Sequence, residues 1–144
     1  MNLSSNFTLE ELTASQTAVR KGFDNTPNAT EIANLVRVAA LLEQVRALVK
    51  KPINVTSGFR SKQVNDAVGS KDTSQHRIGC AADFKVPGMT PKQVVELCVK
   101  ADIGYDQVIQ EFDSWVHISV PDSPSRPPRK QALIIDRQGT RPFK

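Results

Sequence analysis

The segment SQHRIGCAAD, residues 74–83, leads from a polar loop into a predicted strand that continues to Val86. Apolar side chains recur at every second position of this strand, which places them on the core side and Asp83 on the opposite face. Gly79 allows the chain to turn between the loop and the strand. We therefore expect His76 of the loop and Asp83 of the strand to converge.

Helical patterns lie on both sides of this segment. Thr8 and Glu11 have the spacing of a capping box, which predicts a short helix from Leu9. Residues 30–50 carry apolar side chains at intervals of three or four, which predicts the longest helix and the main contribution to the core. Residues 91–104 are predicted as another helix, with a proline at the first position and a glycine closing it.

Further segments show the alternation that is typical of strands. In residues 115–120, Trp115 and His117 share the face opposite to three aliphatic side chains. Residues 131–135 are predicted to form an edge strand followed by a turn. The other predicted strands are residues 52–56 and 106–112. The sequence therefore predicts an α+β fold, in which helices pack on a small, mainly antiparallel sheet.

The length of 144 residues suits one ordinary domain. The one shift in composition follows residue 120, so we predict a domain at residues 1–120. Residues 121–144 form a basic, proline-rich extension that is part of this domain or a tail. The formal net charge of +4 favours anionic surroundings without selecting among them. Because no aromatic platform accompanies the basic residues of the extension, we expect no specific nucleic-acid binding.

Two features bear on the compartment. No stretch approaches the roughly 18 consecutive apolar residues of a membrane span, and the first residues do not resemble a secretory signal. The two cysteines, Cys80 and Cys98, allow at most one disulfide. We therefore expect a monomer in a reducing cytoplasm, without a membrane span.

The only two histidines of the chain, His76 and His117, lie where a core histidine is unusual. Each histidine alone is more often a surface or hydrogen-bonded residue than a metal ligand. Together with Asp83, however, they supply two imidazoles and one carboxylate, a three-ligand set that suits a catalytic zinc and leaves the fourth position for water. The combination predicts a hydrolytic zinc site on the open face of the sheet.

Three motifs follow one another along the chain: SGFRS at residues 57–61, SxHxxGxAxD at residues 74–83 and WVH at residues 115–117. In this order they resemble the M15 zinc peptidases. This family includes D-alanyl-D-alanine carboxypeptidases and phage endolysins that cut the peptide stems of peptidoglycan, and the resemblance covers roughly residues 7–120. It implies that His76, Asp83 and His117 hold zinc and that Arg60 lies near the substrate.

Three residues have predicted roles near the substrate. The Arg60 guanidinium can stabilise a developing oxyanion or hold a substrate carboxylate. Ser74 can orient substrate or backbone near His76, and an ordinary turn hydroxyl explains it equally well. Trp115 can line the substrate groove, or serve as a packing residue.

The general base is where the sequence departs from the best-known family members. Those carry Glu three residues before the last histidine ligand, and here Ser114 occupies that position. The candidates are Glu111 and Asp113 of the predicted hairpin. Strand parity does not decide between them, because a change of one residue in the turn reverses the face. We favour Glu111, since Asp113 suits a turn.

Other functions remain as alternatives. Cys80 lies four residues from His76, and a thiolate with a histidine partner would make a cysteine peptidase. A cysteine in this setting is more often a small buried hydrophobic residue. The absence of Glu at position 114 also allows a non-catalytic wall-binding phage component of the same fold. The favoured prediction is a phage-type endolysin that stays in the cytoplasm until it is released to the wall, ahead of a host D-Ala-D-Ala carboxypeptidase.

Overall fold

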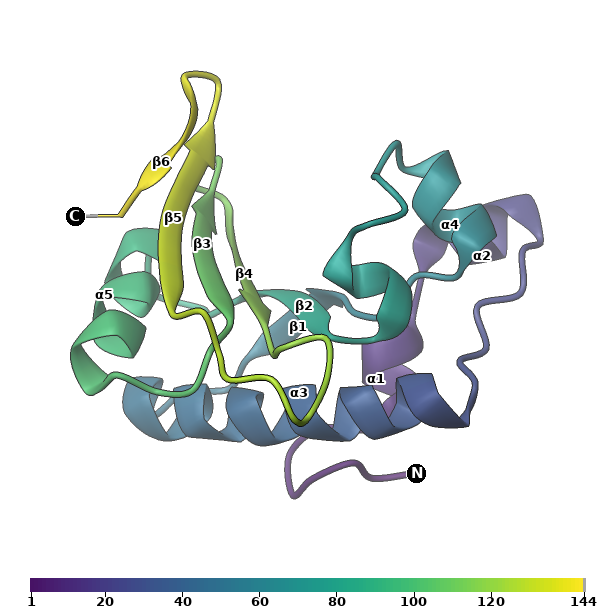
Figure 1. Ribbon diagram of the computed structural model, residues 1–144, viewed down its shortest axis with the longest axis horizontal. Helices are drawn as coiled ribbons and strands as arrows, with labels where there is room; N and C mark the ends of the chain where they lie inside the picture. The colour runs from purple at the N-terminus through teal and green to yellow at the C-terminus, as the bar shows by residue number, and fades with distance from the viewer. Residues whose placement is uncertain (144) are drawn as a thin grey trace.

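A six-stranded mixed sheet forms the centre of the molecule, in the order β1-β2-β4-β3-β5-β6 (Figure 1). The computed structural model describes residues 1–143. Neighbouring strands are antiparallel except β3 and β5, which run parallel. The predicted α+β fold with a mainly antiparallel sheet is therefore confirmed. The strands are β1 Asn54–Ser57, β2 Ala81–Lys85, β3 Gln107–Glu111, β4 Trp115–Ser119, β5 Gln131–Asp136 and β6 Gly139–Pro142.

Five α-helices and one 3-10 helix accompany the sheet in residues 1–143. Capping boxes begin α1, α3 and α5, so the predicted helix start at Leu9 is confirmed. The longest helix is α3, as predicted, and it runs beneath the sheet (Figure 1). The short helix α2 was not predicted, although Ser15 caps it and Gly22 ends it. The helices are α1 Leu9–Thr13, α2 Gln16–Lys21, α3 Ala29–Val49, α4 Lys62–Ala67, η1 Gln75–Ile78 and α5 Pro91–Ala101.

The core lies between the sheet and helices α3 and α5. Leu35 and Leu42 of α3 and Val95 of α5 are fully buried, as are Phe84 of β2 and Ile118 of β4. These positions obey the expected periodicities of 3.6 in helices and 2 in strands. Because the apolar side chains of β2 and β4 fill this face, their polar side chains lie on the other one.

The end of the chain differs from the prediction. Residues 131–135 do not form an edge strand, because β5 lies inside the sheet between β3 and β6. The edge strand is β6. The crossover, residues 120–130, leads from β4 past β3 to β5 on the other side of β3. The closing residue of α5 also differs: Asp102, with a φ of 55°, caps the helix in place of the predicted Gly104.

A buried carboxylate holds the crossover in place. The fully buried Asp106 accepts hydrogen bonds from the Arg129 backbone N–H at 2.9 Å and from its guanidinium Nη2 at 2.6 Å. Lys130 pairs with Asp102, and Arg141 pairs with Asp136 of β5. Much of the positive charge of the extension is therefore neutralised locally. The domain division at residue 120 stays a prediction.

Two sequence-based expectations concern cysteines and membranes. Cys80 and Cys98 are both buried and free of disulfides. Among residues 1–143, no helix combines the length and apolar character needed to cross a membrane.

Candidate active site

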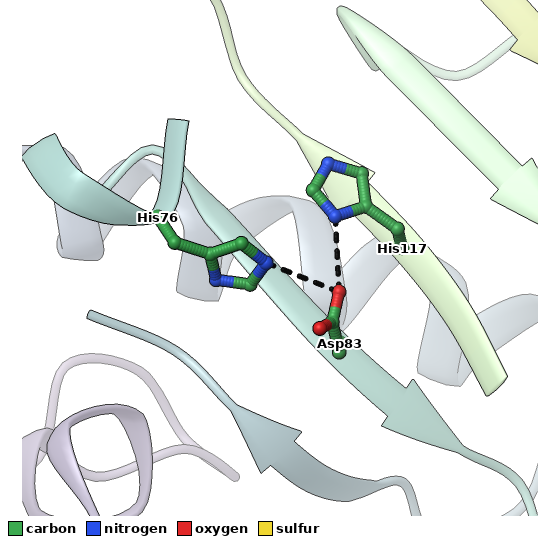
Figure 2. A group of neighbouring side chains, drawn as sticks. All are labelled: His76, Asp83 and His117. Atoms are coloured by element: carbon green, nitrogen blue, oxygen red, sulfur yellow. Dashed lines mark hydrogen bonds and ion pairs between the residues drawn. The ribbon is translucent and has the colours of Figure 1, made fainter. Parts of the chain in front are cut away.

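His76, Asp83 and His117 meet on the face of the sheet opposite to its apolar side chains, where both histidines are buried (Figure 2). The Asp83 Oδ1 atom lies 3.1 Å from His76 Nε2 and 2.9 Å from His117 Nδ1. One potential ligand atom from each residue lies within 4.8 Å of the other two. The structure thus brings together the three predicted ligands as a group that can hold a metal ion.

Strand register and one tight turn produce this convergence. Asp83 of β2 is directly opposite His117 of β4, so both side chains project from the same face. His76 comes from η1, which ends at Gly79 with a φ of 79°. A Cβ at Gly79 would lie 2.7 Å from the Glu31 carbonyl oxygen, so the turn depends on glycine for both its conformation and its packing.

The surroundings of His76 fix its ring in the form that binds metals. Its Nδ1 lies 2.8 Å from the Gly58 carbonyl oxygen, which can only accept, so we place the ring proton on Nδ1. Nε2 then directs a lone pair toward Asp83. Burial lowers the pKa of His76, against the opposing charge of Asp83, and favours the neutral imidazole. Backbone carbonyls orient metal-binding histidines in the same way.

The charge on Asp83 completes the donor set. Burial raises the pKa of the Asp83 carboxyl, but the charge of His76 and hydrogen bonds from His117 and His76 outweigh it and hold the pKa below its ordinary value. Near neutral pH, Asp83 is therefore a carboxylate that faces Nε2 of His76 at 3.1 Å. Either a second ring proton on Nε2 or a metal cation in its place satisfies this contact. This pairing fits a bound metal.

Glu111 and Arg60 flank the three residues. Glu111 of β3 pairs with Trp115 of β4, on the face that carries His117, and its Oε1 lies 3.9 Å from His117 Nδ1. Burial raises the pKa of Glu111, and the charge of Asp83 adds to this, while His117, Arg60 and Trp115 oppose it. The Arg60 guanidinium interacts electrostatically with both carboxylates, and its buried Nε has no hydrogen-bond partner in the described chain.

A family comparison agrees with this geometry. The family model described as Peptidase M15 matches residues 5–119. The chain belongs to the peptidase M15 family. A comparison with curated proteins finds no match. The M15 match extends from just before α1 to the end of β4 and therefore includes the three candidate ligands, whereas β5 and β6 lie beyond it.

The other predicted site residues of this M15 metallopeptidase differ in how close they lie to the three candidate ligands. Trp115 is half-buried beside Glu111, and its buried indole Nε1 has no hydrogen-bond partner among the described residues. Asp113 is exposed in the hairpin turn, with a φ of 49°, and is not part of the group. Ser74 caps η1, where its Oγ accepts a hydrogen bond from the His76 backbone N–H at 3.3 Å. Its observed contact is that of a turn hydroxyl.

The structure does not support the alternative of a cysteine peptidase that uses Cys80 as its nucleophile. Cys80 is fully buried, and burial raises the pKa of its thiol to about 11. Its Sγ lies near the Pro121 carbonyl and the Arg37 guanidinium, at 3.7 and 3.6 Å. A neutral, enclosed thiol is not a nucleophile.

Sequence reasoning missed two residues that support the site. The Asn25 side chain donates to the carbonyls of Thr13 and Phe59 and accepts from the Ser61 N–H, which fixes the SGFRS turn. The buried Gln75 donates to the Val120 carbonyl at 3.0 Å and to Asp122 at 2.8 Å, and so ties η1 to the crossover. A lone Asn or Gln in a loop gives no sequence signal for such long-range contacts.

Proposed function

We propose that this M15 peptidase uses zinc to hydrolyse the peptide stems of bacterial peptidoglycan and works as a phage-type endolysin. The observation that carries the proposal is the convergence of His76, Asp83 and His117 beside Glu111 and Arg60. Family membership supports peptide hydrolysis, and the sequence motifs favour cell-wall peptides as the substrate. In this role the enzyme would reach the wall from the cytoplasm when the host cell is lysed.

The donor set suits zinc. Two neutral imidazoles and one carboxylate leave one position of a tetrahedral ion open, which is the arrangement of catalytic zinc sites. When bound, zinc supplies Lewis-acid polarisation of a carbonyl and acidifies a water molecule. His76 and His117 would donate nitrogen atoms and Asp83 an oxygen atom.

Glu111 is placed to move the proton. Its carboxylate lies on the same face as His117, and its raised pKa makes it a stronger base than an exposed glutamate. It can accept a proton from the attacking water and deliver that proton to the leaving amine. Asp113 is exposed in the turn, so Glu111 is the base that the geometry favours.

Arg60 is placed to hold negative charge. Its guanidinium stays protonated although burial lowers its pKa, since the carboxylates of Asp83 and Glu111 oppose the effect of burial. The guanidinium can donate to the oxygen on which charge develops, or to a substrate carboxylate. Preorganised donors of this kind lower the barrier without having to rearrange during the reaction.

Digestion of purified peptidoglycan tests the proposal. We expect the protein to release peptide fragments, a chelator to stop the release and added zinc to restore it. Mass spectrometry of the fragment ends would identify the bond and distinguish an endopeptidase from a D-Ala-D-Ala carboxypeptidase. Stoichiometric zinc binding without any release would instead support a wall-binding component that has kept the fold.

A further inference from the structure

A groove opens beside the candidate metal centre, between α2, β1 and α4. Its volume is about 980 Å³, and ligand sites typically have volumes of about 300–1,000 Å³. Ser57 and Arg60 line it, and Ser57 is the ladder partner of Asp83. The three candidate ligands do not themselves line the groove, but Ser57 and Arg60 bring one end of it next to Asp83. From there it continues along α2 and α4, which lie side by side in Figure 1.

The walls of the groove combine apolar surface with positive charge. Val19 of α2 and Val68 beside α4 line it and are 83% and 46% exposed, which is unusual for large apolar side chains. Two lining residues are charged, and both are arginines: Arg20 at the end of α2 and Arg60 near Asp83. No carboxylate lines the groove among the described residues.

Arg20 is available to a ligand. It is exposed, and within residues 1–143 its guanidinium has no carboxylate within 4.0 Å. By contrast, the arginines of the C-terminal extension at positions 126, 129 and 141 have such partners. An unpaired guanidinium over an apolar groove is complementary to an acidic peptide, because it can form two parallel hydrogen bonds to a carboxylate.

We propose that this groove binds an acidic peptide, with a free carboxylate of the peptide held by Arg20 and the bond to be cut at the end beside Arg60. The proposal rests on the peptidase function above and extends it by assigning substrate specificity to Arg20. A peptidoglycan stem supplies such a carboxylate on its D-Glu residue. Its short aliphatic side chains would contact Val19 and Val68, which both line the groove.

Steady-state kinetics with two synthetic stem peptides test the proposal. One peptide keeps the free carboxylate of D-Glu, and in the other this group is amidated. With zinc-loaded enzyme, we expect Arg20→Gln to raise KM for the acidic peptide at least about tenfold, because it removes the charge-assisted hydrogen bonds to the carboxylate, and to leave kcat unchanged. For the amidated peptide, the wild-type enzyme and Arg20→Gln should have the same KM. Arg20→Lys should restore part of the preference, because it keeps the charge but not the planar fork.

The neighbouring residue provides a matched control. Lys21 is an exposed cation at the end of the same helix and does not line the groove. Lys21→Gln removes the same charge but outside the groove, so it should leave KM unchanged for both the acidic and the amidated peptide. An equal effect of Arg20→Gln and Lys21→Gln would show a general loss of positive charge and would overturn the proposal.

The outcomes separate this proposal from the peptidase function. If the wild-type enzyme cuts the acidic and amidated peptides equally well, the role of Arg20 is wrong and the peptidase function stands. If it cuts neither peptide, the peptidase function fails, and calorimetric titration of the metal-free protein with the acidic peptide tests the groove directly. Binding of the acidic peptide would support the groove if Arg20→Gln weakens it about tenfold and Lys21→Gln leaves it unchanged. Absent binding, or equal binding by all three proteins, would refute it.

Discussion

Replacing Gly58 by alanine is predicted to weaken zinc binding and to destabilise the fold at the same time. A Cβ at Gly58 would lie 2.2 Å from the carbonyl oxygen of Leu12 and 2.8 Å from its carbonyl carbon, whereas ordinary contact begins at 3.4 Å. Both are backbone atoms of α1, and the same oxygen accepts a hydrogen bond from the Phe59 N–H at 2.8 Å. The turn after β1 must therefore move by on the order of 1 Å, and such overpacking costs about 1–3 kcal/mol of stability.

The effect on zinc follows from the other side of the same residue. The Gly58 carbonyl accepts the Nδ1 proton of His76 at 2.8 Å, and a displacement of this size would break that bond. The imidazole would lose the partner that fixes its tautomer and orientation. Loss of such a supporting contact typically lowers metal affinity by about 10–100-fold.

Two measurements check this prediction, and another glycine serves as the control. Competition with a zinc-binding dye gives the affinity, and urea unfolding of the metal-free protein gives the stability. Gly104→Ala is the control, because an added Cβ there meets nothing within 4 Å, so a change below about 0.5 kcal/mol is expected. If Gly58→Ala matches this control in both measurements, Gly58 does not lie as close to the backbone of α1 as described. If stability falls but zinc affinity does not, the carbonyl does not orient His76.

Three further predictions concern the base, the thiol and the crossover. Glu111→Gln should lower kcat at least about 100-fold with zinc content unchanged, whereas Asp113→Asn should not; the reverse pattern would make Asp113 the base. Iodoacetamide at pH 7.5 should leave activity intact, since burial raises the pKa of Cys80 to about 11; stoichiometric inactivation would contradict this. Asp106→Asn should cost about 1–3 kcal/mol in urea unfolding, because it removes charge-assisted bonds to a half-exposed Arg129. Burial raises the pKa of Asp106, but the hydrogen bonds and charge of Arg129 outweigh burial and hold the pKa of the folded protein below 3.8. This stabilisation is therefore present above pH 3.8 and is lost as the pH falls through the pKa of Asp106 in the folded protein. Below pH 3.8, the Tm of Asp106→Asn should depend less on pH than the Tm of the wild-type protein.

The sequence by itself determined the three candidate metal ligands and most of the helices and strands around them. The alternation in residues 81–86 and 115–120 placed Asp83 and His117 on the face opposite to the aliphatic side chains, as the structure has them. A capping box located the start of α1, and a proline at the first helical position located the start of α5. These features are local, since side-chain direction in a strand and the cap of a helix depend on residues only a few positions apart.

Tertiary structure decided which carboxylate stands beside the histidines. The turn between β3 and β4 contains residues 112–114, and two of them have positive φ. That length keeps Glu111 opposite Trp115 and leaves Asp113 in the turn. One residue more or fewer would have reversed the face, which is why strand parity alone left two candidates. The catalytic role of Glu111 stays a prediction.

Tertiary structure also decided the position of β5 and the shape of the groove. β5 pairs parallel with β3, and Asp106 holds the crossover that leads into β5 through a contact across 23 positions in the chain. The groove exists because α2 comes to lie beside β1 and α4, which follow it much later in the sequence. Alternation and helix periodicity report only which face of an element is buried. They carry no information on which other element covers that face, so pairing partners and clefts arise only when the whole chain packs.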